Sequence, residues 1–267
     1  MGTLEARRSV WSAEFLKQLD TLTSGRSLSD YKYSKDAENA REVKIIGIVR
    51  PTVRTYTGAD ITIDSAIDDA LFLNIDQYKY IAVELDKVDK SQSKVQMEEW
   101  AEQGAQALAD TADQYVNSLA QYTDYKSAST DLAAGTGAKA LVKGATIQMY
   151  TNNVSVKTGL YGQVCPEFYA VLRDEVNSLD TDNSELLKKG IVGTYLNVNF
   201  MIDNKLYNDG TDYYNMVRTK RAIAYVEQLN EIEFFMPEKR FSEAVKILLT
   251  YGAKIVRPKE LYVMRSH

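Results

Sequence analysis

Side chains that act as nucleophiles, general bases or zinc ligands are scarce in this 267-residue chain. It contains one histidine, His267, which is the last residue of the sequence, and one cysteine, Cys165. Residues at a chain end are usually poorly ordered, so we expect no Ser-His-Asp or Cys-His site built on His267. One cysteine forms no intrachain disulfide and gives a zinc site too few ligands. The sequence therefore predicts neither nucleophilic nor zinc-dependent chemistry.

Two short segments have some features of ligand-binding loops. The stretch AGTGAKALVKGAT, residues 134–146, matches neither glycine pattern that binds phosphate groups, and it predicts a loop followed by a short amphipathic segment. The acidic stretch 180–185 has Glu185 at the sixth position, where an EF-hand calcium loop needs glycine. Asn183, Glu185 and Gly190 instead predict the cap, first turn and end of a short helix.

The remaining charged clusters favour exposed surface. Adjacent acidic residues, at 68–69 and 98–99, point in different directions on a strand or helix, so they do not form a catalytic carboxylate pair. The longest basic run, Arg218–Arg221, predicts a solvated patch on the surface. The sequence thus assigns no catalytic, cofactor-binding or metal-binding residue, and it predicts no cofactor.

Composition places the chain among folded globular proteins. Hydrophobic residues make up 45% and charged residues 26%, which leaves enough apolar material for a sizeable core. The net charge is −5, whereas a sequence-reading nucleic-acid-binding domain is usually basic. No apolar run reaches the ~18 residues of a membrane helix, and the N-terminus lacks the apolar core of a signal peptide. We expect one extended unit with subdomains, made in a reducing cytoplasm.

The N-terminal segment predicts an amphipathic helix followed by a polar arm. Residues 10–22 carry Trp11, Phe15 and other apolar residues on one helical face, and Gly25 ends the helix. The next stretch, residues 26–42, is polar and lacks clear periodicity. A helix joined to a polar arm indicates a segment that packs against another part of the chain or another molecule.

Residues 44–88 predict a long two-stranded excursion. Residues on both sides of Pro51 and over 78–88 have strand composition, whereas 64–77 are open between a helical turn and a loop. Because an isolated hairpin is marginal in water, we expect this excursion to pack on a neighbour, which can be another subunit.

The clearest helix is predicted over residues 90–121. About 30 residues would make a rod of roughly 45 Å, and an apolar stripe repeats at i, i+3 and i+4 spacing. Gly104 costs about 1 kcal/mol relative to alanine in a helix and suits a close packing contact. The stripe comprises Met97, Trp100, Ala101, Leu108, Ala112, Tyr115 and Leu119, with Asp110 and Asp113 among its polar neighbours.

Short helices and strands alternate from residue 135 onward. Pro166 predicts the first turn of a helix over residues 165–179. Residues from Phe241 fit both a helix and a strand, and the alternation that continues through Tyr251 favours a strand. Strands are predicted at residues 194–202, 221–228, 246–256 and 260–264.

The order of these elements resembles the major capsid proteins of tailed bacteriophages, which have the Hong Kong 97-type (Johnson) fold. VWSAEFLKQL resembles the N-terminal arm of that family. VRPTVRTYTGADITID and NIDQYKYIAVELDKVDKSQS resemble its extended loop and the return into a long spine helix. LYGQVCPEFYAVLRDE resembles a strand and helix of the axial domain, and FSEAVKILLTYGAKIVRPKELYVM resembles its closing strands with a tyrosine-glycine turn.

The resemblance implies an α+β fold with a defined organisation along the chain. It consists of an N-terminal arm, an extended β-hairpin loop, a long spine helix, and peripheral and axial domains. The expected bounds are an arm at 1–43, an extended loop at 44–89, the spine helix and peripheral domain at 90–134, an axial domain at 135–240 and closing strands at 241–267.

The resemblance also implies a structural function without catalysis. Copies of the chain would form hexamers and pentamers that close an icosahedral shell around double-stranded DNA, which it would contact weakly and non-specifically. Further implied partners are a portal protein, a scaffold and decoration proteins, with no membrane. The protein would be assembled in the host bacterial cytoplasm and reside in the virion capsid.

Three other functions stay open at this point. One is an encapsulin, a nanocompartment shell of similar fold that encloses cargo enzymes instead of DNA. Another is a soluble α+β enzyme or binding protein, which would need a pocket with converging polar groups. The third is a tail or minor head protein of a phage. Some members of the capsid family crosslink through a lysine in the extended loop, but residues 45–78 contain no lysine, so no such crosslink is expected.

Overall fold

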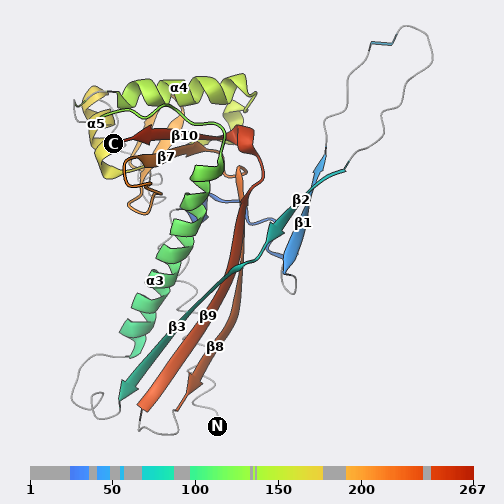
Figure 1. Ribbon diagram of the computed structural model, residues 1–267, viewed down its shortest axis with the longest axis vertical. Helices are drawn as coiled ribbons and strands as arrows, with labels where there is room; N and C mark the ends of the chain where they lie inside the picture. Colours follow the sequence, from blue (N-terminus) through green and yellow to red (C-terminus); the bar gives the residue numbers. More distant parts are fainter. Residues whose placement is uncertain are drawn as a thin grey trace.

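The computed structural model describes residues 25–35, 41–48, 55–56, 68–86, 97–132, 135, 137–176, 191–236 and 242–267. The chain forms a head of one sheet and two helices, a long stem, and a thin hairpin that projects to one side (Figure 1). The predictions for residues 10–22, 180–185 and 183–190 lie outside the described residues.

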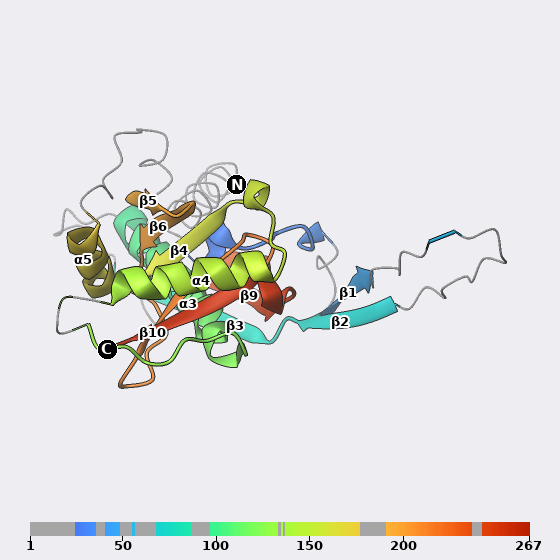
Figure 2. The same cartoon turned by 90° about the horizontal axis from the view of Figure 1, so that it is seen from above.

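The head is built on a five-stranded sheet in the order β10-β7-β4-β6-β5. Strands β4 and β6 pair in parallel and the other neighbours are antiparallel. Helix α4 crosses the head in the view from above, next to α5 and β10 (Figure 2). The bounds are β4 Leu160–Val164, β5 Gly193–Tyr195, β6 Val198–Ile202, β7 Tyr213–Arg218, β10 Leu261–Ser266, α4 Ala138–Thr151 and α5 Pro166–Glu175.

Several local predictions for the head are confirmed. Pro166 is the first residue of α5, where its missing N–H costs nothing. The glycine-rich stretch leads into α4 through Gly137, whose φ of 106° is costly for any residue with a Cβ. The strand predicted at 194–202 is two short strands, because Leu196 and Asn197 have φ of 49° and 62° and form the turn between β5 and β6.

The stem consists of a three-stranded antiparallel sheet, order β3-β9-β8, with helix α3 packed against it. Strand β9, Ser242–Ile255, pairs with β3, Gln77–Asp86, on one side and with β8, Ile223–Phe235, on the other. This confirms the strand interpretation of the segment after Phe241. Helix α3, Met97–Ser118, has 22 residues or about 33 Å, and the predicted residues 90–96 lie outside the described residues. At its other end the predicted helix stops earlier, because Leu119–Tyr122 tighten into a 3-10 turn.

The projecting hairpin is antiparallel, with β1 at Glu42–Ile48 and β2 at Asp68–Asn74. Two predictions for this region are wrong. The segment expected to be a helical turn or loop contains β2, because its cross-strand partners in β1 impose extended backbone. Residues 77–86 belong to the stem as β3 and not to the excursion, because they find a ten-residue partner in β9.

A backbone crossing replaces the expected tyrosine-glycine turn. Tyr251 and Gly252 lie within the continuous strand β9. A Cβ on Gly252 would lie 2.2 Å from Asn74 O and 3.0 Å from Ile75 Cα. Glycine is therefore needed here because the end of the hairpin passes directly over β9, not because the chain turns.

Two apolar clusters of different size hold these parts together. The main core fills the space between α3, α4, α5 and the two sheets. A second, small cluster anchors the hairpin at its base, and we call it the hairpin-base cluster. Its buried members are Val43, Ile45, Leu73, Ile75, Ala224 and Val226, with Tyr33, Leu71 and Val256 packed against them.

Candidate functional site

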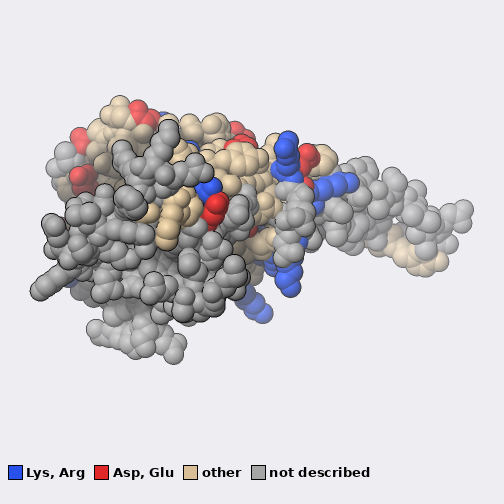
Figure 3. All heavy atoms as spheres, turned by 90° about the horizontal axis from the view of Figure 1, so that it is seen from below, with Lys and Arg blue, Asp and Glu red and all other residues tan. Residues whose placement is uncertain are grey.

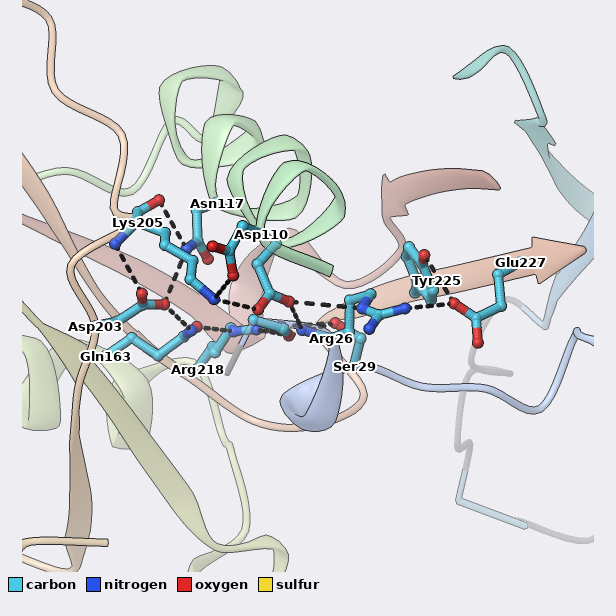
Figure 4. Close-up of polar contacts among 12 residues, drawn as sticks. Arg26, Ser29, Asp110, Asn117, Gln163, Asp203, Lys205, Arg218, Tyr225 and Glu227 are labelled. Atoms are coloured by element: carbon cyan, nitrogen blue, oxygen red, sulfur yellow. Dashed lines mark hydrogen bonds and ion pairs between the residues drawn. The ribbon is translucent and has the colours of Figure 1, made fainter. Parts of the chain in front are cut away.

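The basic run Arg218–Arg221 does not form the solvated patch that was predicted. Arg218 and Thr219 are fully buried, and Lys220 is exposed. Arg218 is the last residue of β7, which lies between β10 and β4, and its side chain is fully buried among residues of β4 and the N-terminal segment. We call the polar network around it the buried junction (Figure 4).

The guanidinium of Arg218 donates only to neutral acceptors. Its Nε donates to Gln163 Oε1 at 2.9 Å, and its Nη2 donates to Gly25 O at 2.7 Å. Its Nη1 contacts Leu28 O at 3.2 Å and Ser29 Oγ at 3.3 Å. Burial lowers the pKa of Arg218 to about 10, partly offset by Asp203 and Asp113, so it remains cationic at neutral pH.

Asp113 links α3 to two cations. It was expected among the polar neighbours of the α3 stripe, yet it is fully buried. Its Oδ1 accepts from the backbone N–H of Arg26 at 2.9 Å, and its Oδ2 lies 3.3 Å from Lys205 Nζ. Lys205 also pairs with Asp110 at 2.7 Å, and Arg26 pairs with Glu227 at 2.7 Å. These contacts compensate the cost of burying the carboxylate.

Asp203 connects the other side of the junction. Its Oδ2 accepts from Asn117 on α3 at 3.0 Å and from Gln163 on β4 at 3.2 Å, and its Oδ1 accepts from the backbone N–H of Lys205 at 2.8 Å. The junction therefore joins the N-terminal segment, α3, the five-stranded sheet and β8. Its members bond mainly to one another within the protein, which suits a structural joint better than a ligand site.

Cys165 is buried at the start of α5 and does not have the surroundings of a nucleophile. Its Sγ accepts from the backbone N–H of Phe168 at 3.4 Å and caps the helix. Burial raises the pKa of the thiol, which lowers its thiolate fraction and its reactivity at neutral pH. The sequence analysis missed this capping role, although a polar atom before Pro166 was a usable signal.

His267 is held in place, contrary to the expectation for a terminal residue. Its backbone N–H donates to Thr130 O and its carbonyl accepts from Leu132, because residues 125–132 run beside β10. Its Nδ1 lies 3.2 Å from Asp212 Oδ1 and 3.0 Å from Ser129 Oγ. A Ser-His-Asp triad needs the two ring nitrogens to serve different partners, and here one nitrogen meets both. The cluster therefore fastens the chain and does not form a nucleophile.

Other kinds of site are not found in the part of the chain that the structure describes. No group of three or more His, Cys, Asp or Glu side chains gathers there in a way that could hold a metal ion. Within the same residues, no helix has the length and apolar character to cross a membrane.

The surface around the base of the hairpin combines basic side chains with exposed large apolar ones. Lys and Arg side chains gather there in the view from below (Figure 3). Lys254 Nζ donates to Phe72 O of β2 at 2.7 Å, and Lys44 on β1 is exposed. Large apolar side chains also face solvent nearby, since Phe72 is 45% exposed and, on β3, Tyr78 and Tyr80 are 58% and 76% exposed. Such side chains are typical of surfaces that contact another protein.

Comparison with solved structures shows which proteins share this architecture. A structure from Mycobacterium phage Che8 has a TM-score of 0.75 and 27% identity, over 91% of this chain and 90% of that chain. The mature capsid of bacteriophage PhiM1 has a TM-score of 0.69 and 15% identity, over 91% and 87%. The virus-like particle from Pyrococcus furiosus has a TM-score of 0.62 and 10% identity, over 94% and 96%. No protein-family model and no curated protein matches the sequence.

Proposed function

We propose that this chain, which has the Hong Kong 97-type capsid fold, is the major capsid protein of a tailed bacteriophage. The observation that carries the proposal is structural similarity along nearly the whole length of both chains, including a phage structure at 27% identity. The same fold appears at lower identity in the capsid of Ralstonia phage GP4, with a TM-score of 0.68 over 93% of this chain. The proposed function is structural and has no catalytic step.

The proposed assembly unit is a hexamer or pentamer of this chain. Subunits that contact one another through two different surfaces form rings when the rotation between neighbours closes, and such rings can tile a shell. The hairpin β1–β2 suits one of these contacts, because it projects from the body and carries exposed Phe72 and Lys44. Residues 1–43 are proposed as the N-terminal arm and residues 44–76 as the extended loop, because β3, Gln77–Asp86, pairs with β9 in the stem. The spine helix and peripheral domain are proposed over 90–134, the axial domain over 135–240 without β8, and the closing strands over 241–267.

The partners beyond the shell itself also belong to this proposal. They are packaged double-stranded DNA, a portal protein, a scaffold and decoration proteins, with assembly in the host bacterial cytoplasm. A net charge of −5 supports weak, non-specific contact with DNA, because a chain with more acidic than basic residues gains little from neutralising phosphates.

Electron microscopy of the expressed chain tests the proposal directly. The chain is produced alone and with its neighbouring genes, separated by size and imaged in negative stain. Closed shells, or rings of five or six subunits, are expected. A compact monomer of about 30 kDa in every preparation would reject the proposal in favour of a soluble binding protein.

A designed deletion tests the role of the hairpin. Ile48 and Asp68 face each other across β1 and β2, so residues 49–67 can be replaced by a two-residue Asn-Gly turn. The hairpin-base cluster stays intact because Leu73 and Ile75 are kept. We expect a soluble, folded subunit that forms no shells, with Gly144→Ala, where a Cβ meets no atom within 4 Å, as the assembly-competent control. Normal shells from the shortened chain would contradict the proposed contact.

A nanocompartment shell is the second candidate. The observation in its favour is the match to the virus-like particle from Pyrococcus furiosus, which covers 96% of that chain. Extracting the contents of purified shells separates the two functions, since nucleic acid or scaffold is expected from a phage shell and a cargo enzyme from a nanocompartment.

The extended loop is not expected to crosslink. Residues 45–78 contain no lysine, so the loop tip supplies no amine for an isopeptide bond. Mature shells should therefore dissolve into a single band of about 30 kDa on a denaturing gel, and a covalent ladder would contradict this proposal.

A further inference from the structure

Residues 25–35 lie as a strap across the buried junction. Gly25, Leu28 and Ser29 supply three of the four acceptors of Arg218, through two carbonyl oxygens and one hydroxyl. Gly25 also lies against α3, since a Cβ there would come within 3.0 Å of Asn117 Oδ1. A fully buried guanidinium needs acceptors around it, and the strap provides most of them.

The contacts that hold residues 25–29 of the strap against the body are mainly polar. The one large apolar side chain that the strap buries at this end is Leu28, which packs in a small cluster with Ile191 and Met201. The other fixed points are Arg26, whose N–H donates to Asp113, and Ser29, whose Oγ donates to Gly25 O at 3.0 Å. Hydrogen bonds to charged groups, and not hydrophobic area, therefore hold residues 25–29 in place.

The strap continues directly to the base of the hairpin. Asp30 N–H donates to Ile223 O at 2.9 Å and Asp30 O accepts from Tyr225 N–H at 3.1 Å, so Asp30 forms a single parallel β-bridge to β8. The ring of Tyr31 meets that of Tyr225 edge-on at 5.5 Å. Tyr33 then packs against the hairpin-base cluster, which also contains Val43 of β1.

We propose that Arg218 is a positioning residue for assembly. Its hydrogen bonds to residues 25–29 hold the strap in place, and the strap in turn fixes the direction in which the hairpin leaves the body. Among the described residues, the hairpin meets the body mainly through the hairpin-base cluster, the crossing at Gly252, the bond from Lys254 to Phe72 O and the bond from Tyr115 OH to Asp76 Oδ1. A strap anchored at one end on Arg218 and packed at the other against the cluster removes freedom that these contacts leave. The consequence for shells rests on the proposed function, whereas the geometric part does not.

Two variants loosen the strap in different ways. Arg218→Gln removes the donors to Gly25, Leu28 and Ser29. Gly25→Ala keeps every donor but adds a Cβ 3.0 Å from Asn117 Oδ1 and 3.4 Å from Asp113 O, so it crowds the strap against α3. The backbone of Gly25, with φ of −64°, accepts alanine, which leaves crowding as the only effect. Gly144→Ala on α4 is the matched control, because its Cβ meets no atom within 4 Å.

Hydrogen exchange on the full-length chain, with all variants in the same oligomeric state, measures the seating of the strap. Both variants should speed exchange of the strap amides, such as that of Asp30, and of Tyr225 by about tenfold or more. The amides of Ser127 and Val263, which pair beside β10, should keep their wild-type rates, and in Gly144→Ala the strap amides should exchange no faster than in wild type. Arg218→Lys keeps the charge with fewer donors and should lie between wild type and Arg218→Gln.

The direction of the hairpin is measured separately. Spin labels are placed at Lys44→Cys on β1 and Lys139→Cys on α4, both exposed positions, in a Cys165→Ser background. Pulsed electron paramagnetic resonance should give a narrow distance distribution that broadens in Gly25→Ala and Arg218→Gln and stays narrow in Gly144→Ala.

Two results would overturn the inference. In one, the strap amides of folded Gly25→Ala keep wild-type exchange rates. In the other, exchange is faster but the hairpin distances are unchanged, so that the strap stabilises the junction without positioning the hairpin. If Arg218→Gln does not fold, the exchange rates and distance distributions of Gly25→Ala alone test the inference. Absence of shells from the wild-type chain would reject the proposed function and leave these measurements valid.

Discussion

The hairpin and the body of this chain are stabilised in different ways. The body contains the main core, and α3, α4, α5 and both large sheets contribute side chains to it. The hairpin is two strands wide and reaches the body through the small hairpin-base cluster. The body has a large core of its own, whereas the hairpin depends on what it touches, because isolated hairpins are marginal in water. That difference suits a subunit whose projecting part completes its contacts on a neighbour.

The largest expected effect concerns the body. Asp113→Ala leaves Arg26 and Lys205 near a junction without its carboxylate, and breaking a buried ion pair costs about 3–5 kcal/mol. The midpoint of chemical denaturation should fall accordingly. Asp124→Ala, at an exposed position, is the control and should lie within about 0.5 kcal/mol of wild type. An equal effect of the two variants would show that the junction does not support the body.

Gly252→Ala should act on the hairpin more than on the body. The added Cβ would lie 2.2 Å from a backbone oxygen, so the base of the hairpin must move, at a cost of about 1–3 kcal/mol. We expect faster exchange of the Ile75 amide, which donates to Arg41 O, while amides of the five-stranded sheet keep their rates. If amides of the body and the hairpin exchanged faster by the same factor, the prediction that Gly252→Ala acts mainly on the hairpin would be wrong.

Alkaline titration should affect the contact between the two regions. Burial raises the pKa of Tyr251 to about 12, and burial together with Asp76 at the end of the hairpin raises that of Tyr115 to about 12. Between the ordinary pKa of 10 and 12 the native chain therefore keeps protons that the unfolded chain has released, so stability falls as the pH rises. Denaturation at a series of pH values, with tyrosinate absorbance in parallel, measures this. Tyr251→Phe should reduce the dependence, and an unchanged slope would contradict the assignment.

The smallest expected effect is a gain in stability in the stem. Gly104 lies within α3, and an added Cβ would meet Ile81 Cδ1 at 3.5 Å, an ordinary contact. Gly104→Ala should therefore raise stability by about 0.5–1 kcal/mol, because alanine favours the helix. Thermal unfolding measures the change, with Gly144→Ala on α4 as the second helical glycine. A loss of stability would mean that α3 and β3 pack too closely for a methyl group.

Several features of the fold were predictable because their causes are local. Proline is favoured at the first position of a helix, where Pro166 lies, and the alternation from Val245 to Tyr251 suits a strand with one buried face. The scarcity of histidine and cysteine limited the chemistry without any structure. The order of such elements was sufficient for the resemblance to capsid proteins.

The roles of Arg218, Asp113 and Gly252 were decided only by tertiary structure. Arg218 meets an acceptor 193 positions away, at Gly25, so its own basic neighbours gave the wrong prediction of an exposed patch. The α3 pattern showed that Asp113 is polar but not that Arg26 and Lys205 would enclose it. The sequence favoured a turn at Gly252, whereas the structure shows that glycine is needed because the hairpin crosses β9 there. The burial of a side chain and the space around a Cβ depend on segments that only folding brings together. The sequence therefore determined the helices and strands, and the tertiary structure determined which side chains meet where these elements pack.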